Sequence, residues 1–328
     1  MRNKLLKKAD YDKMMKMTVA EISHYLQELE YKEEIDALAL DYQGIDLIER
    51  VLQRNIYKNI QKLIRISPTE LRQLIIVYQK RYDIYNFKTI IRGVFSNLKT
   101  DEIKRYLNPI SPKEQALFDK LLNLETVEEI VGMLDFLPEQ DRRTGLDCLK
   151  SKNSLLLLEN ALDKYYFSFV SSHIPSFSQE GRLYKKLLML EIDAMNIKTL
   201  LRAKQEKMQE QNLKDMFFAF GTLKKQIIER LSKTDIGTIL KELEETSFAS
   251  VAAELMKMQP LSLSAAEMQL EIFLLKSAQR LIKQRPLSVD VILGYMFMKD
   301  IEIKNISRIT KAKALSLDDS FISQVVVV

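Results

Sequence analysis

The sequence predicts an all-α protein built from three similar helical domains. Three observations support this: a helix-favouring composition, one short motif that occurs three times, and nearly even spacing between the copies. Leu, Ile, Lys, Glu, Met and Gln are abundant and suit helices, whereas only 8 Gly and 7 Pro in 328 residues leave little room for tight turns. Only residues 325–328, a run of four valines, resemble a strand, and we interpret them as a frayed apolar tail.

The repeated motif is an acid, an asparagine three residues later, and a base six residues after the asparagine. Its asparagines are Asn86, Asn196 and Asn305, spaced by 110 and then 109 residues. The acids are Asp83, Asp193 and Glu302, and the bases are Arg92, Arg202 and Lys311. Because a fixed period is the signature of a repeat architecture, we expect repeat units at 1–112, 113–231 and 232–328.

Each motif copy is predicted to lie on an amphipathic helix. Ile84, Phe87 and Ile91 stand at positions i, i+3 and i+7, which share one helix face. Asparagine is a poor helix former, so its recurrence indicates that its amide bonds something fixed, such as the end of a neighbouring helix. The six motif acids and asparagines are therefore expected to be structural.

The bases of the motif helices allow two interpretations. In the first, these helices are simply the packed centre of each unit. In the second, their bases face a partner protein. The candidate partner-contact residues are Lys88, Arg92, Lys198, Arg202, Arg308 and Lys311.

The first repeat unit contains three predicted helices with recognisable boundaries. A short helix begins at Thr18, with Glu21 completing a capping box, and Gly44 marks a break before a long helix over 47–66. The motif helix is expected to begin with Ser67 as N-cap, followed by Pro68. It is expected to stop at Gly93.

The second and third repeat units show the same order of helices. Short-helix sequences recur at 126–130 and 234–239, long-helix sequences at 158–164 and 270–276, and a loop over 172–178 precedes the second motif helix. Each long helix carries a glutamate 37, 37 or 34 residues before the motif asparagine: Glu49, Glu159 and Glu271. Three long units favour a closed, funnel-like arrangement about a pseudo-threefold axis, because closure lets each unit bury its flank.

The search for chemistry finds no catalytic, cofactor-binding or metal-binding constellation. His24 lies in the short helix and His173 in a loop, neither with the i, i+4 partner of a zinc helix. No glycine-rich phosphate loop is present. The single cysteine, Cys148, cannot form an internal disulfide and is expected to be a buried thiol. We expect neither an enzyme nor a bound cofactor.

The charge pattern is unlike that of a nucleic-acid binder, and the lack of membrane-spanning and signal sequences predicts a cytoplasmic protein. The net charge is +5, and acids and bases are interleaved along the chain, whereas a nucleic-acid binder concentrates bases on one face. No run of 18 apolar residues could span a membrane, and no signal peptide is apparent.

The motif sequences also resemble a known family. The stretches from Asp83 to Arg92 and from Glu191 to Arg202 are similar to repeated signatures of the C subunit of V-type/A-type ATPases (ATP synthases), the homologue of the d subunit of the eukaryotic vacuolar ATPase. The segment from Pro286 resembles the family's last long helix. The third copy departs from the pattern, with Ser307 and Arg308 in place of Lys-Thr, and the N-terminus looks shorter than the family's first helix.

The resemblance implies a funnel of three helical domains that performs no chemistry. Such a protein would be a peripheral rotor subunit on the cytoplasmic face of the membrane, without a transmembrane segment. It would link the D and F subunits of the central shaft to the membrane proteolipid ring and transmit torque for H⁺ or Na⁺ transport. Neither nucleic acid nor a small-molecule substrate would be a partner.

Three other functions remain open from the sequence. A helical-repeat adaptor outside any ATPase would have the same composition. A nucleic-acid-binding helical protein is suggested by the sequence pI of about 8.9, and it would bind with a steep salt dependence. An unrecognised enzyme would need convergent polar groups, for example His173 with nearby carboxylates.

Overall fold

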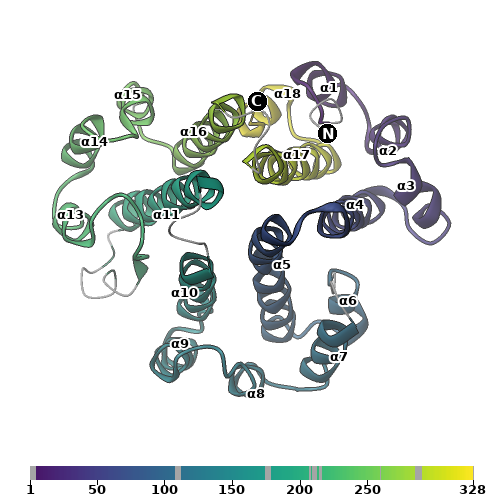
Figure 1. The fold of residues 1–328 in the computed structure, drawn as a ribbon, viewed down its shortest axis with the longest axis horizontal. Coiled ribbons are helices and arrows are strands. Elements are labelled where there is room, and N and C mark those ends of the chain that lie inside the picture. Colours follow the sequence, from purple (N-terminus) through teal and green to yellow (C-terminus); the bar gives the residue numbers. More distant parts are fainter. Residues whose placement is uncertain are drawn as a thin grey trace. The chain divides into compact units, whose positions relative to one another are not determined.

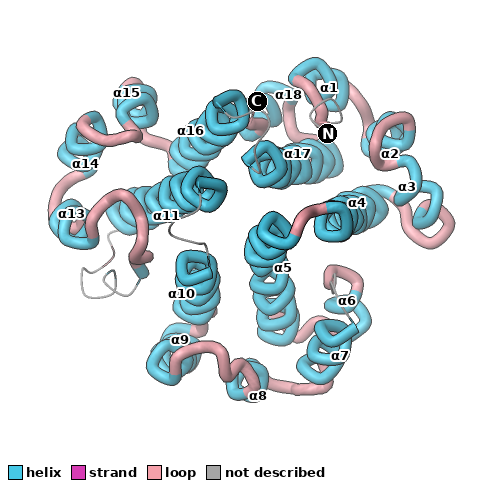
Figure 2. Tube along the Cα trace, in the orientation of Figure 1, coloured by secondary structure: helices cyan, strands magenta, loops and turns pink. Residues whose placement is uncertain are grey.

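The computed structural model describes residues 5–107, 112–173, 179–206, 208, 213, 216–258, 260–284 and 290–327. Within these residues every regular element is a helix (Figure 2), so the predicted all-α fold class is confirmed. The helices are α1 (Lys8–Met14), α2 (Val19–Gln27), α3 (Lys32–Leu38), α4 (Gly44–Ile66), α5 (Thr69–Phe95), α6 (Thr100–Lys104), α7 (Pro112–Leu121), α8 (Val127–Gly132), α9 (Glu139–Lys152), α10 (Leu156–His173), α11 (Gln179–Gln205), α13 (Lys225–Leu231), α14 (Ile236–Glu244), α15 (Ala249–Met256), α16 (Leu263–Gln284), α17 (Asp290–Ala314) and α18 (Asp319–Val325).

The chain divides into two compact units. Unit 1 comprises Met1–Ile56 and Ser176–Val328, and unit 2 comprises Tyr57–Pro175. Unit 2 begins inside the first expected repeat and ends inside the second. The repeat boundaries at 112 and 231 describe the period of the sequence and stay a prediction, whereas the compact units are offset from them.

Unit 2 is built around the motif helix α5. Helix α5 packs against α10, and helices α6 to α9 form an outer row (Figure 1). The ring of Phe87, from the predicted apolar stripe, lies 5.6 Å from Phe118 and 5.2 Å from Phe136. The motif helix of the first expected repeat therefore fills a core made by residues of the second, which explains the offset of the unit.

The close approach of α9 to α10 depends on Gly145. A Cβ atom there would lie 2.3 Å from Cδ2 and 3.3 Å from Cα of Leu158 on α10. We therefore expect Gly145→Ala to destabilise the protein by about 1–3 kcal/mol in urea denaturation, since it overpacks a buried contact. Gly132→Ala is the matched control, because nothing lies within 4 Å of a Cβ at Gly132. Equal stability of the two variants would contradict the prediction.

Unit 1 contains the other two motif helices, α11 and α17. Helix α11 packs against α13 and α16, and α15 covers α16 from outside (Figure 1). Helix α17 packs against α16 on one side and against α1, α2 and α18 on others. Each motif helix thus packs against several helices of its own unit.

The first and last helices of the chain share one hydrophobic core in unit 1. Met14, Ile22 and Leu26 from α1 and α2 are fully buried in a cluster that also contains Ile306 and Ile309 of α17. Leu47, Ile48, Val51 and Leu52 of α4 and Val326 belong to the same cluster. Residues from both halves of the sequence must therefore meet before this core exists.

Several predicted boundary signals are confirmed. Thr18 and Glu21 form the predicted capping box at the start of α2, and Thr126 forms the same box at α8. Asp235 caps α14, the third short helix. Gly44, at the start of α4, has a φ of 61°, a value that glycine adopts without strain.

Two predicted boundaries of the first motif helix are wrong. The N-cap is Pro68 and not Ser67, because the Ser67 amide instead bonds the Leu63 carbonyl at the end of α4. Gly93 does not stop the helix, which continues to Phe95. Its lack of a side chain serves packing: a Cβ atom would lie 2.5 Å from the side chain of Ile103.

The three motif helices end in the same way. In each, an amide twelve residues after the motif asparagine bonds back to a carbonyl five residues earlier, the long bond of a Schellman motif. The bonds run from Leu98 to Gly93, from Met208 to Ala203 and from Leu317 to Ala312, each at 2.9 Å. The structural repeat therefore extends beyond the residues of the motif.

Candidate functional site

The motif asparagine of α11 holds a linker segment by its backbone. The Asn196 side chain donates to the Phe218 carbonyl at 3.0 Å and accepts from the Phe218 amide at 2.8 Å. Both partners are buried. The side chain thus pairs with Phe218 as a neighbouring strand would, and the expectation that the motif amide bonds something fixed is confirmed here.

The motif asparagine of α17 makes the same contact at the same sequence separation. Asn305 donates to the Val327 carbonyl at 2.6 Å and accepts from its amide at 2.9 Å, 22 residues along the chain as in the pair above. The expectation of a frayed tail at 325–328 is therefore wrong for its described residues. Val326 and Val327 are buried, and the asparagine holds the backbone that follows α18.

The motif acid of α11 binds the segment that leads into α13. Asp193, fully buried, accepts from the backbone amides of Thr222 at 2.8 Å and Leu223 at 3.1 Å, and from the Thr222 hydroxyl. These residues directly precede α13. Burial raises the pKa of Asp193 above its ordinary value, opposed by these hydrogen bonds.

The motif acid of α17 binds the segment that leads into α1. Glu302 accepts from the Leu6 amide at 2.6 Å, just before α1, and from the Tyr31 hydroxyl at 2.6 Å. Lys299 on the same helix donates to Glu302 at 2.6 Å and to Tyr31 at 3.0 Å. Burial raises the pKa of Tyr31 well above its ordinary value, so the phenol stays neutral and donates.

The acid and the asparagine of the first motif copy, Asp83 and Asn86, are also buried. Asp83 pairs with Lys80 at 2.7 Å, and burial raises the pKa of Asp83 while Lys80 opposes the rise. A partner 22 residues beyond Asn86 would be residue 108, which lies outside the described residues. The equivalence of this copy to the other two stays a prediction.

In unit 2, the motif bases pair with acids of α10. Lys88 lies 2.6 Å from Asp163, and Arg92 donates to both carboxylate oxygens of Glu159 at 2.6 Å. The bidentate geometry fits a guanidinium and a carboxylate particularly well. These bases of the first expected repeat therefore join it to the long helix of the second.

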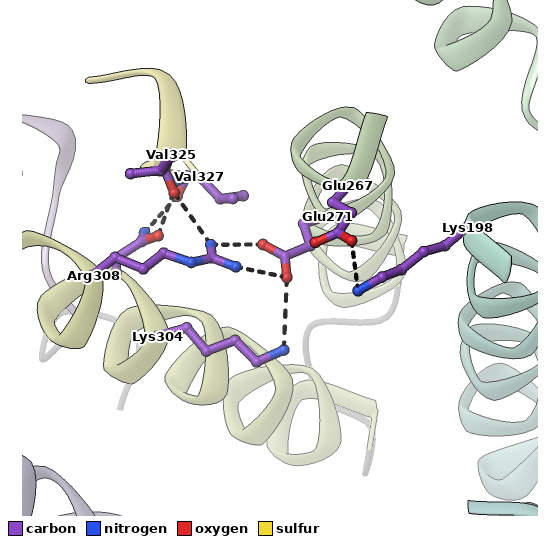
Figure 3. Close-up of polar contacts among 8 residues, drawn as sticks. Lys198, Glu267, Glu271, Lys304, Arg308, Val325 and Val327 are labelled. Carbon is purple, nitrogen blue, oxygen red and sulfur yellow. Dashed lines mark hydrogen bonds and ion pairs between the residues drawn. The ribbon is translucent and has the colours of Figure 1, made fainter. Parts of the chain in front are cut away.

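In unit 1, the bases of α11 and α17 pair with two acids of α16. Lys198 and Arg202 lie 2.9 and 3.0 Å from Glu267. Arg308 donates to both oxygens of Glu271 at 2.7 and 2.9 Å and also to the Val325 carbonyl (Figure 3). Helix α16 is thereby fixed to both neighbouring motif helices.

The last motif helix pairs with the first long helix of the chain. Lys311 lies 3.2 Å from Glu49 on α4, and the Ser307 hydroxyl donates to the same carboxylate. With Arg92 on Glu159 and Arg202 on Glu267, the pattern is cyclic: each motif helix binds the long helix of the following repeat, and the third binds the first. The sequence showed two of these glutamates as a recurring position, but it did not identify them as partners.

Glu271 is the most connected of these acids. Burial alone would raise its pKa, but the hydrogen bonds from Arg308 and the charges of Lys304, Arg308 and Lys198 outweigh burial and hold the pKa below its ordinary value of 4.5. Its folded-state pKa is therefore lower than its unfolded-state pKa. The resulting stability is present above pH 4.5 and is lost as the pH falls through the folded-state value.

We expect Glu271→Gln to lower the free energy of unfolding by about 1.5–3 kcal/mol at pH 7, the range for hydrogen bonds to charged groups. The difference between wild type and variant should shrink as the pH falls below 4.5, as measured by urea denaturation at a series of pH values. Glu242→Gln is the control, because its partner Arg230 is 59% exposed and such pairs contribute little. A difference that is unchanged or larger at low pH would refute the assignment.

Residues considered for chemistry lie apart from these contacts. His24 lies in α2, as predicted, and is exposed. His173 is the last residue of α10 and not part of a loop, and its ring stacks on Phe169 at 4.1 Å. Cys148 is a buried free thiol, as predicted. Among the described residues no group of three His, Cys, Asp or Glu could hold a metal ion.

None of the helices in the described ranges is long and apolar enough to cross a membrane. The polar residues of the three motif copies bind other helices and linkers of the same chain. The fold and these contacts define a helical repeat protein whose repeats are joined by polar contacts.

Comparison with known proteins places this repeat protein in a family. The family described as ATP synthase (C/AC39) subunit matches residues 1–325. The A-type ATP synthase C subunit of Methanococcoides burtonii is 32% identical over 330 residues, which cover 100% of this chain and 91% of that protein. The A-type ATP synthase C subunit of Methanosarcina acetivorans is 31% identical, and the match covers 100% of this chain and 90% of that protein. The C subunit of Archaeoglobus fulgidus is 26% identical, and the match covers 93% of this chain and 87% of that protein. The chain belongs to the ATP synthase (C/AC39) subunit family.

Proposed function

We propose that this chain is a non-catalytic rotor subunit of an A/V-type ATPase. It links the D and F subunits of the central shaft to the membrane proteolipid ring and transmits torque for H⁺ or Na⁺ transport. It is peripheral and lies on the cytoplasmic face. Its three repeats surround a pseudo-threefold axis as a funnel that receives the shaft.

The observation that carries the proposal is the cyclic set of contacts between motif helices and following repeats. A protein that transmits torque must resist shear between its own parts, and close-packed helices supply stiffness. Each junction adds directional contacts: Asp193 and Asn196 hold one linker, and Arg92 and Glu159 form a bidentate pair. Such contacts set the register between elements, because they fail when the partners slide by one residue.

The proposal is tested by isolating the tagged chain from detergent-solubilised membranes. We expect the nucleotide-binding head, the D and F subunits and the proteolipid to co-isolate in fixed proportions. Membranes lacking the chain should hydrolyse ATP without transporting ions, because torque no longer reaches the ring. A chain that isolates alone, or with proteins unrelated to the ATPase, would favour an adaptor and refute the proposal.

The motif bases remain candidates for the shaft contact, although each already has a partner inside the chain. Arg92, Arg202 and Lys311 keep 54%, 44% and 55% of their side chains exposed while paired. A partner carboxylate can therefore reach them without breaking the internal pair. Lys88, only 15% exposed, is committed more fully to Asp163.

A charge swap separates the two roles of Arg92. We expect Arg92→Glu to weaken binding of the D and F subunits, both by removing the base and by placing two acids together. The double variant Arg92→Glu with Glu159→Arg restores the internal ion pair but moves the positive charge to α10. If Arg92 contacts the shaft, the double variant should still bind weakly in a pull-down. Full rescue would assign Arg92 to internal structure alone.

A further inference from the structure

Phe220 is an exposed aromatic residue in a strained backbone conformation. Its φ is 75° and its relative exposure is 56%. Positive φ is uncommon for any side chain and unusual for a bulky one. The other non-glycine residues with positive φ in the described part are Asn97, Asn153 and Ser316. Each lies one or two residues after the end of a helix, where this conformation is routine.

The segment around Phe220 is held on both sides by the motif of α11. On one side Asn196 pairs with the Phe218 backbone, and on the other Asp193 binds the backbone of Thr222 and Leu223. The neighbouring Gly221 fits against the same acid, since a Cβ atom there would lie 2.0 Å from Asp193 Oδ1. These contacts leave the backbone at Phe220 little freedom to relax.

A strained conformation persists only where the surrounding structure imposes it, and such residues cluster at functional positions. Within this chain the Phe220 ring gains little, because more than half of the residue remains in water. Rigidly presented aromatic side chains are, however, the residues that dominate binding at protein interfaces. Holding the ring in place beforehand removes the entropy cost of ordering it on binding.

We propose that Phe220 is an anchor residue that inserts into an apolar pocket on an adjoining protein of the ATP synthase. Lys224, exposed four residues later at the N-cap of α13, favours a pocket with an acidic rim. A protein pocket suits the observations better than a lipid surface, because insertion into lipid does not require a fixed backbone. The inference rests on the proposed function only in needing a neighbouring protein in the complex.

The occupant can be identified by photo-crosslinking from position 220. Phe220 is replaced by benzoyl-phenylalanine, and Phe321 on α18, which is 48% exposed in an ordinary helix, is replaced in the same way as the matched control. After irradiation of membranes, we expect position 220 to crosslink to one identified protein of the ATPase more strongly than position 321. Crosslinks only to lipid, or none while the other ATPase proteins co-isolate, would overturn the inference and leave the proposed function intact.

Two substitutions test whether strain is maintained for binding. Phe220→Gly should raise the melting temperature of the isolated chain by roughly 2–4 °C, because glycine accepts this φ. The same variant, and Phe220→Ala, should raise the dissociation constant for the remaining complex by about tenfold or more. Phe321→Ala is the control for binding. Unchanged affinity in both Phe220 variants, or an equal loss in Phe321→Ala, would overturn the assignment.

Discussion

Replacing Glu302 with leucine is expected to destabilise unit 1 by about 3–5 kcal/mol, the cost of breaking a buried ion pair by removing one partner. Lys299 is 1% exposed, and its ammonium group lies 2.6 Å from the Glu302 carboxylate. Without the carboxylate, the buried Lys299 ammonium would lose its opposite charge, and the Tyr31 hydroxyl and Leu6 amide would lose their acceptor. The effect is measured as a shift of the urea denaturation midpoint.

Two controls assign the effect to the unpaired charge. The double variant Lys299→Met with Glu302→Leu should recover most of the loss, because it replaces both charges with apolar groups. Glu254→Leu breaks another lysine–glutamate pair with a three-residue spacing, but Lys257 there is 68% exposed, so the cost should stay below about 1 kcal/mol. Equal stability of the Glu302 variant and the Glu254 variant would refute the explanation.

Replacing Asn196 with alanine is the second change with a large expected effect. It leaves the buried amide and carbonyl of Phe218 without their partner, and each unsatisfied group costs about 1–3 kcal/mol. We therefore expect a total loss of about 2–6 kcal/mol. Hydrogen exchange provides the local measurement: the Phe218 amide should lose protection in the variant.

Asn305, which bonds the Val327 backbone in the same way, provides a reciprocal control for this prediction. Asn305→Ala should expose the Val327 amide to exchange and leave the Phe218 amide protected, while Asn196→Ala should do the reverse. The two residues have the same type of backbone partner at the same separation of 22 residues. Simultaneous loss of protection at both amides would indicate global unfolding and contradict the local assignment.

The fold class and the repeat were readable from the sequence because both depend on local pattern. The 3.6-residue period placed Ile84, Phe87 and Ile91 on one face, and these residues are buried in α5. The capping box at Thr18 also depends only on residues close in sequence, and it formed as predicted. Helix ends were less reliable, because Gly93 is retained for packing against Ile103 and not as a stop.

The partners of the motif residues could not be derived in this way. Arg92 pairs with an acid 67 residues away, and Asn305 with a backbone group beyond α18. A helical pattern predicts which face of a helix is buried, but not which element covers it. The recurring Glu49 and Glu159 were the available signal, because an acid at one position of each sequence repeat and a base at another indicate a pair between repeats.

The shared core of the first and last helices has a consequence for synthesis of the chain on the ribosome. Tyr31 and Glu302, which bond in that core, are 271 residues apart. At a translation rate of about 5–20 residues per second, α17 is synthesised roughly a quarter of a minute to a minute after α1 and α2. The helices translated first are thus among the last to find their native neighbours, and in the nascent polypeptide they need shielding from other exposed chains.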